Sequence, residues 1–220
     1  DCKELSEPYR PGKLREMSFA NIIAMVKEHR SLYGFYSDNL VGDYKRTIDR
    51  LQKEQRAAIE QQFSSFGNVL YSELHDFLNH GHEWIAAYDE SLASVHGLDF
   101  TDLICGVHRL FQDPIVRERW RSRYSYISVD EMQDTGVLEY KVLEMLWEGN
   151  HVLLCGDYFQ TIYEWRGSDP FRLLKQFDAD FKPLKIIFYE NYRSNWTLFT
   201  MAFKTLQNMF PNLVGSIYTE

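Results

Sequence analysis

Two adjacent carboxylates, Asp130 and Glu131, stand directly after the short apolar run 126–129 and are followed by Gln133 and Asp134. The run is rich in β-branched and aromatic residues, which predicts a buried parallel strand. In open α/β sheets, ligands bind outside the carboxyl ends of the strands. One carboxylate there can hold Mg²⁺ through its water shell, and its neighbour can orient or deprotonate an attacking water. The alternative is that these acids only suit the dipole at the N-terminus of a following helix.

A second predicted strand, His151–Cys155, is followed by Gln160, Trp165 and Arg166. The amide of Gln160 can donate a hydrogen bond to a phosphate oxygen and accept one from a water. An exposed indole beside a guanidinium forms a platform that stacks a base and pairs with a phosphate. The simpler alternative places Trp165 in the core and Arg166 beside a surface carboxylate.

A third predicted strand, Lys185–Tyr189, leads to Tyr192 and Arg193. An arginine just beyond a strand end can reach a γ-phosphate and stabilise the charge of the transition state. Tyr192 is suited to stacking on a purine or simply to packing. Together the three strand ends carry an Asp-Glu pair, a Gln and an Arg, which are the groups that a nucleotide-hydrolysis site needs.

The elements that must position these residues change in character near Gly97. The residues before it are predicted to be helical, with a first core-facing stripe, an N-cap at Ser18 and a later helical region, 70–93, that breaks between Asn79 and Gly81. The first stripe comprises Phe19, Ile22, Ile23 and Val26.

After Gly97, strands alternate with helices, which predicts an α/β fold with a parallel sheet covered by helices. The predicted order is helix Asp99–Leu110, strand Tyr124–Val129, helix Gly136–Trp147, strand His151–Cys155, helix Pro170–Phe177, strand Lys185–Tyr189 and helix Trp196–Met209. In the helix after the first strand, the side expected to be apolar carries Leu138, Val142, Met145 and Leu146.

The composition narrows the class of protein. Three cysteines at unrelated spacings predict a reducing, cytoplasmic environment without a disulfide framework, and there is no membrane-spanning apolar stretch in the sequence. The net charge of −8 argues against a surface that grips nucleic acid mainly through counterion release. Because the chain begins with Asp1 and not Met, we expect it to be a piece of something longer.

Four motifs in order give the chain a specific resemblance. They are Leu98–Ile104 (LDFTDLI), Val129–Thr135 (VDEMQDT), Gly156–Gly167 (GDYFQTIYEWRG) and Asn191–Ser194 (NYRS). This part of the chain resembles the UvrD/Rep/PcrA-type superfamily 1 DNA helicases, whose segment ahead of Walker B, Walker B motif, motif III and motif IV these segments match. The resemblance implies a partial RecA-like (P-loop NTPase) parallel sheet with flanking helices. It also implies a helical accessory domain at residues 1–97, the second half of the first motor domain at 98–190 and the start of the second motor domain at 191–220.

The resemblance also implies roles for the matching residues. It implies ATP and Mg²⁺ as cofactors, and single-stranded DNA, single-strand/duplex junctions and the remaining helicase domains as partners. The assigned roles are Mg²⁺ coordination for Asp130, activation of water for Glu131, γ-phosphate sensing for Gln160, an arginine finger for Arg193, adenine contact for Tyr192, and contact with DNA for Trp165 and Arg166. Translocation is expected to run 3′ to 5′, as in the family.

One part of such a motor does not occur in these 220 residues. The phosphate-cradling loop Gly-x-x-x-x-Gly-Lys-Ser/Thr is absent from the sequence, so the chain alone is expected to hydrolyse ATP negligibly. Two alternatives stay open: a helicase-like module that binds nucleic acid or protein without hydrolysis, and a part of a helicase–nuclease.

Overall fold

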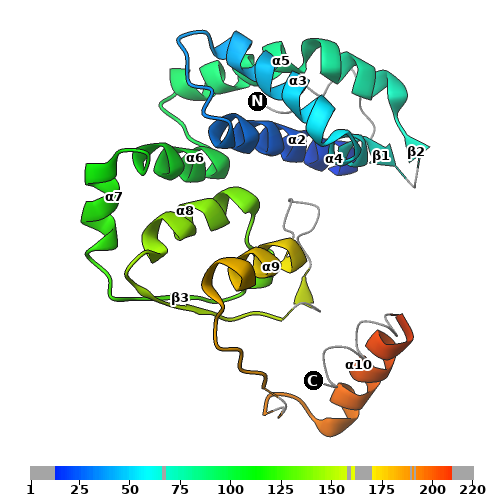
Figure 1. The fold of residues 1–220 in the computed structure, drawn as a ribbon. Coiled ribbons are helices and arrows are strands. Elements are labelled where there is room, and N and C mark those ends of the chain that lie inside the picture. The colour runs from blue at the N-terminus through cyan, green and yellow to red at the C-terminus, as the bar shows by residue number, and fades with distance from the viewer. Residues whose placement is uncertain are drawn as a thin grey trace. The chain divides into compact units, whose positions relative to one another are not determined.

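The computed structural model describes residues 13–65, 68–157, 160–161, 170–188, 190 and 192–209, and its contacts divide the chain into two compact units, Asp1–Gln176 and Phe177–Glu220 (Figure 1). Most elements belong to the first unit. Within the described residues, no helix combines the length and the apolar character needed to cross a membrane.

Helices dominate the first part of the first unit. They are α2 (Lys13–Leu32), α3 (Leu40–Glu54), α4 (Arg56–Gln62) and α5 (Tyr71–Ser94), with a short antiparallel pair, β1 (Ser64–Ser65) and β2 (Asn68–Val69), between the last two. The predicted stripe of α2 is confirmed, since Ile22, Ile23 and Val26 are buried in one core with residues of α3 and α5. Figure 1 shows these helices side by side.

Two predictions about these helices are wrong. Ser18 is not an N-cap, because α2 already begins at Lys13 and Ser18 lies inside it. The break between Asn79 and Gly81 does not occur either, because α5 runs without interruption from Tyr71 to Ser94. Gly81 is buried beneath the Phe77 ring, and a Cβ there would come within 2.5 Å of that ring. The glycine therefore serves close packing one turn along the helix and not a bend.

The helix α6 (Phe100–Leu110) begins as predicted, with Asp99 as its N-cap. Asp99 accepts from the backbone N–H of Asp102, and the Asp102 carboxylate accepts from that of Asp99, so the two residues form a capping box. The following helix, α7 (Pro114–Arg121), begins with Asp113 as N-cap.

A buried lysine joins α6 to the helices before it. Lys27 of α2 is 4% exposed, and its Nζ lies 3.0 Å from Asp89 of α5, 2.8 Å from Asp99 and 2.5 Å from Asp102. Burial alone would lower the pKa of Lys27, but the hydrogen bonds to Asp102 and Asp99 outweigh it and raise the pKa well above its usual value. Tyr44 donates to Asp89 and Tyr88 donates to Asp99, so the cluster connects α2, α3, α5 and α6.

In the described part of the chain, the parallel sheet has two strands, β3 (Tyr126–Val129) and β4 (His151–Leu154), paired Tyr126↔His151 through Val129↔Leu154. Between them lie a 3-10 turn, η2 (Met132–Asp134), and helix α8 (Val137–Trp147), which make a β–α–β unit. In α8 the fully buried residues are Leu138, Tyr140 and Trp147. Of the predicted apolar side, only Leu138 is among them; the other three are half-buried.

The sheet is smaller and less buried than predicted. Alternate residues of both strands are exposed, Tyr126 at 77% and Leu153 at 57%, because only one face of the pair is shielded by the rest of the described unit. The predicted third strand is also wrong within the described residues, since 182–188 carry no strand pairing. Apolar side chains of that segment, Leu184, Ile186 and Phe188, are exposed. An extended segment becomes a strand only when a neighbour takes its backbone hydrogen bonds.

Two helices complete the described elements. Helix α9 (Pro170–Phe181) extends past its predicted end at Phe177, and α10 (Trp196–Met209) has the predicted bounds. The second unit, described by itself, contains the end of α9, the extended segment 182–188 and α10.

Candidate active site

The carboxyl ends of β3 and β4 lie side by side, and the backbone between them is tied by hydrogen bonds beyond the last paired residues. The N–H of Cys155 donates to the carbonyl of Val129 at 2.8 Å, and the N–H of Met132 donates to the carbonyl of Cys155 at 2.9 Å. The turn that follows β3 is therefore fastened to the end of β4. The structure thus brings Asp130 and Glu131 to the same edge as Asp157 and Gln160.

Asp130 and Glu131 are both exposed at this edge. Oδ1 of Asp130 accepts from the N–H of Glu131 at 2.9 Å, and the exposed carboxylate can offer its other oxygen as a ligand. Glu131 has φ 52° and ψ 40°, in the left-handed region. A residue other than glycine in that region costs on the order of 1 kcal/mol, and such strain concentrates at functional sites.

In the sequence, Gln133 is notable only because it follows Asp130 and Glu131. In the structure, it lies between the turn after β3 and the segment after β4. Its side chain is buried, with Nε2 donating to Glu131 Oε2 at 2.6 Å and Oε1 accepting from the N–H of Asp157 at 3.0 Å. No sequence pattern signals this, because Asp157 lies 24 residues further along the chain.

Gln160 is exposed and belongs to the same edge. Its Nε2 donates to Asp157 Oδ2 at 2.9 Å and its backbone N–H donates to the carbonyl of Asp157 at 3.0 Å. The amide oxygen therefore remains available as an acceptor, and the side chain stands within reach of a ligand placed over the strand ends.

The other four predicted site residues lie outside the described residues or in the second unit. Trp165 and Arg166 lie outside the described residues. Tyr192 and Arg193 are exposed in the second unit, where Tyr192 donates to Glu190, and that hydrogen bond raises the pKa of the Tyr192 hydroxyl. Their predicted roles stay predictions.

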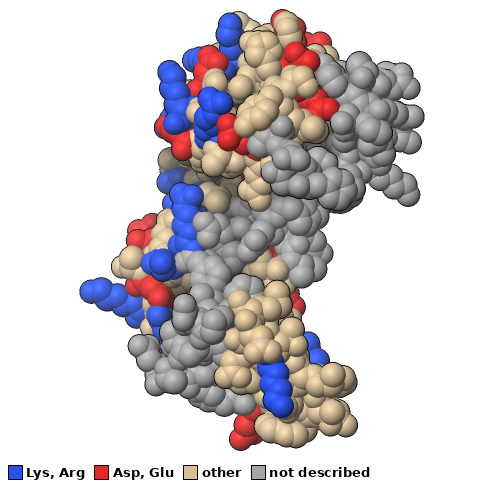
Figure 2. Space-filling model, turned by 90° about the vertical axis from the view of Figure 1, so that its right-hand side faces the viewer, with Lys and Arg blue, Asp and Glu red and all other residues tan. Residues whose placement is uncertain are grey.

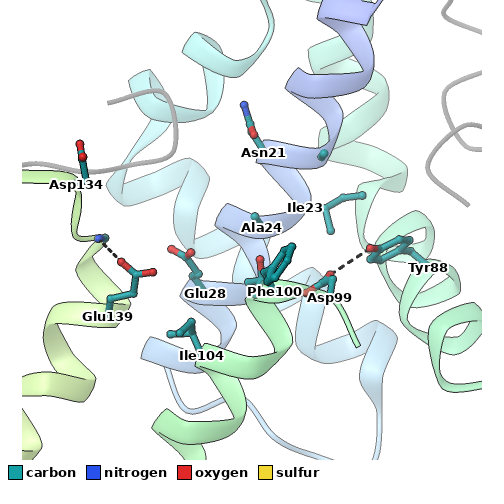
Figure 3. A pocket seen from close by; sticks show the side chains of 13 residues that line it. Asn21, Ile23, Ala24, Glu28, Tyr88, Asp99, Phe100, Ile104, Asp134 and Glu139 are labelled. Carbon is teal, nitrogen blue, oxygen red and sulfur yellow. Dashed lines mark hydrogen bonds between the residues drawn. The ribbon is translucent and has the colours of Figure 1, made fainter. Parts of the chain in front are cut away.

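A separate cavity of about 280 Å³ lies between α2 and the starts of α6 and α8 (Figure 3). Its acidic lining comes from Glu28, Asp99, Asp134 and Glu139, beside the rings of Tyr88 and Phe100. Neither Asp130 nor Glu131 lines it. Two of the four acids have structural tasks: Asp99 caps α6, and Glu139 accepts from the N–H of Gly136 at the start of α8. The cavity is therefore distinct from the strand-end site.

The charge on the surface is mixed. In Figure 2, the Lys and Arg side chains of the described residues stand beside Asp and Glu on the face drawn, and no single positive surface extends over it. This agrees with the net charge of −8.

The chain is similar to DNA helicases of bacteria. It is 34% identical over 143 residues to DNA helicase II of Haemophilus influenzae, covering 63% of this chain and 20% of that protein. It is 42% identical over 114 residues to the ATP-dependent DNA helicase Rep of Buchnera aphidicola subsp. Schizaphis graminum, covering 50% and 17%. It is 36% identical over 126 residues to the ATP-dependent DNA helicase PcrA of Staphylococcus aureus, covering 56% and 17%.

The chain thus spans about a fifth of the length of these relatives. The family model of the UvrD/REP helicase N-terminal domain matches residues 8–182, which include the strand-end site and most of the first unit. With this match extending over well more than half of its length, the chain belongs to the UvrD/Rep helicase family.

Proposed function

We propose that the chain is part of an ATP-dependent DNA helicase, which couples ATP hydrolysis to 3′-to-5′ movement along single-stranded DNA and to unwinding of duplex DNA. One observation carries the proposal: an exposed Asp-Glu pair after β3 and an exposed Gln after β4 meet at one sheet edge, joined through Gln133. The similar proteins named above are DNA helicases, two of them ATP-dependent by name.

The exposed oxygens at the edge fit the cofactor. Among the described residues, no three His, Cys, Asp or Glu side chains converge on a metal site. Mg²⁺ in nucleotide sites uses one or two carboxylates together with waters and substrate phosphates, so the exposed carboxylate of Asp130 matches that requirement. When bound there, Mg²⁺ would supply positive charge to the β- and γ-phosphates.

Glu131 is proposed as the residue that activates water. Its carboxylate would accept a proton from a water whose oxygen attacks the γ-phosphorus, while the bond to the β–γ bridging oxygen breaks and ADP leaves. Gln160 would donate its amide hydrogen to the γ-phosphate, and Arg193 would balance the negative charge of the transition state, with Tyr192 against the adenine.

The remaining assignments rest on the family. Trp165 and Arg166 would contact single-stranded DNA, including that at single-strand/duplex junctions. The sheet would be part of a RecA-like motor domain at 98–190, with residues 1–97 as the accessory domain and 191–220 opening the second motor domain. The rest of the helicase would supply the other partners, and the protein would act in the cytoplasm.

The test is steady-state ATP hydrolysis by the full-length helicase with and without single-stranded DNA. Glu131→Gln should lower kcat roughly 100-fold or more and leave the KM for ATP nearly unchanged, because a general base acts in the transition state. Glu90→Gln is the matched control, since Glu90 is exposed on α5 away from the strand ends. Equal kcat values for the Glu131→Gln variant and the parent would contradict the proposal.

The 220-residue chain by itself should not turn over ATP at the family's usual rate. Without the backbone cradle and the lysine of a phosphate loop, the strand-end site lacks most of the groups that grip the β- and γ-phosphates. We expect turnover far below the usual range of roughly 1–100 s⁻¹. The absence of a phosphate loop from the sequence also favours a second candidate function, a helicase-like module that binds nucleic acid or protein without hydrolysing ATP. DNA binding by a full-length protein that shows no ATPase activity would support this second candidate.

A further inference from the structure

The side-chain amide of Gln133 makes hydrogen bonds to both sides of the strand-end site, to Glu131 and to Asp157. Its side chain is 2% exposed, and it is held between the turn after β3 and the segment after β4. We propose that Gln133 is a positioning residue that sets the carboxylate of Glu131 and ties it to the segment carrying Gln160. The inference rests on the proposed function, because the carboxylate it sets is the proposed base.

The donor side of the Gln133 amide acts on Glu131. Glu131 is exposed, and a free glutamate side chain at such a position would sample several rotamers. The hydrogen bond from Gln133 Nε2 to Glu131 Oε2, at 2.6 Å, fixes one carboxylate oxygen and leaves the other for a water. Because the amide is neutral, it orients the carboxylate without bringing a positive charge that would weaken it as a base.

The acceptor side of the same amide holds the segment after β4. Gln133 Oε1 accepts from the N–H of Asp157 at 3.0 Å, and Asp157 in turn accepts from Gln160 Nε2. The backbone comes this close because residue 156 is a glycine: a Cβ there would stand 2.6 Å from Gln133 Oε1. Three hydrogen bonds therefore lead from the carboxylate of Glu131 to the amide of Gln160.

Few side chains could replace Gln133. The position demands a donor toward Glu131 and an acceptor toward Asp157 at the ends of one side chain, which a carboxamide provides. Glutamate keeps the size and the acceptor but loses the donor and faces Glu131 with a like charge. Leucine keeps the approximate volume and loses both hydrogen bonds. These two substitutions therefore separate the donor half of the proposed role, the contact with Glu131, from the acceptor half, the contact with Asp157.

Hydrogen–deuterium exchange of this chain, followed by mass spectrometry in peptides that contain Asp157, tests the acceptor half. Gln133→Leu should speed exchange at Asp157 about tenfold, because its N–H loses its partner, while Gln133→Glu should stay within about twofold of the parent. Gln112→Leu is the matched control, because Gln112 also donates from Nε2, to the carbonyl of His108, but lies at the end of α6. Unchanged exchange in Gln133→Leu would overturn the link to Asp157.

Steady-state kinetics of the full-length helicase tests the donor half. Gln133→Glu and Gln133→Leu should both lower kcat roughly 10- to 100-fold with little change in the KM for ATP, whereas Gln112→Leu should match the parent. A purely structural role would spare Gln133→Glu, so parental kcat in that variant would overturn the proposal. A parent protein without ATPase activity would instead overturn the proposed function, and the exchange result would still decide whether Gln133 holds Asp157.

Discussion

At the scale of single residues, Gly156 controls how closely the ends of β3 and β4 approach. It has no positive φ, so its requirement is steric: a Cβ would meet Gln133 Oε1 at 2.6 Å and the backbone nitrogens of Gln133 and Met132 at 3.3 Å. Gly156→Ala should push the Gln133 amide off Glu131 and Asp157. We expect the free energy of unfolding to fall by about 1–3 kcal/mol, measured by urea denaturation of the chain.

Gly106→Ala is the control for that measurement. Gly106 lies inside α6, and a Cβ there would meet nothing within 4 Å. This substitution should raise the free energy of unfolding by about 0.4–1 kcal/mol, because alanine restricts the unfolded chain at no steric cost. If Gly156→Ala also raised the free energy of unfolding, the close approach of the backbone at Gly156 would not be needed for the packing of the site.

Residue types alone predicted part of this site. Asp130, Glu131 and Gln160 were found because polar residues after apolar runs mark strand ends, and the structure places all three at one edge. The part played by Gln133 and the left-handed backbone of Glu131 could not be found in that way. Both depend on where the chain returns 24 residues later, and no local spacing encodes that return.

At the scale of elements, Lys27 holds α2, α5 and α6 together. Lys27→Met should lower the free energy of unfolding by about 3–5 kcal/mol, because three aspartates would be left facing one another without their cation. Lys45→Met, on the exposed side of α3, should stay within about 0.5 kcal/mol of the parent. Calorimetry or urea denaturation measures both. A loss below about 1 kcal/mol for Lys27→Met would mean that the helices pack without needing the cluster.

A second contact between α2 and α6 should make stability depend on pH. Ser31 Oγ lies 2.9 Å from Nδ1 of His108 and accepts a hydrogen bond from Tyr36, so the buried imidazole is held in a hydrogen-bonded contact between the two helices. Burial lowers the pKa of His108 below its usual 6.5. His108 therefore binds a proton more readily in the unfolded chain than in the folded one. The stability that neutral His108 contributes is complete above pH 6.5 and is lost as the pH falls through the pKa of the folded state.

The free energy of unfolding should accordingly decline from pH 7 to pH 5.5, as measured by urea denaturation at each pH. His108→Gln should make that decline shallower, because one of the groups responsible is removed. His75→Gln should leave it as in the parent, since His75 is exposed on α5. A decline of the same steepness in His108→Gln would assign the effect to other groups, such as His29, whose pKa burial also lowers.

Most elements could be predicted from the sequence, and the failures have a common cause. The start of α6 was predicted because a capping aspartate acts within one turn, and the bounds of α10 follow its local pattern. Within the described residues 185–188, the predicted third strand failed because strand formation depends on a neighbouring strand and not on the segment itself. The unbroken α5 failed as a prediction because the tertiary packing of Gly81 overrides its weak helix propensity.

At the scale of the whole molecule, the division of the chain by contacts differs from the division predicted from the sequence. The contacts separate it after Gln176, whereas the change of pattern and the family resemblance place boundaries after residues 97 and 190. The relatives named above are roughly three times as long as this chain, since the 143 aligned residues of DNA helicase II are only 20% of that protein. The exposed apolar side chains outside α10 include Tyr126 and Leu153 of the strand pair and Leu184, Ile186 and Phe188 of the segment after α9. The domain boundaries therefore stay predictions.

The net charge of −8 belongs to the whole chain and gives it no general attraction to a polyanion. Binding of single-stranded DNA would therefore have to come from specific contacts. If the proposed DNA contact exists, stacking on Trp165 should supply much of the affinity. Trp165→Ala should then cost about 1–3 kcal/mol, the value of one stacked base, in fluorescence anisotropy over a salt series. Trp120→Ala is the control, since the Trp120 indole is exposed and has the Arg123 guanidinium over its ring, 5.4 Å from the ring centroid. Equal affinity of the parent and both variants would place Trp165 in the core, and absence of binding at low salt would mean that the DNA site requires other parts of the helicase.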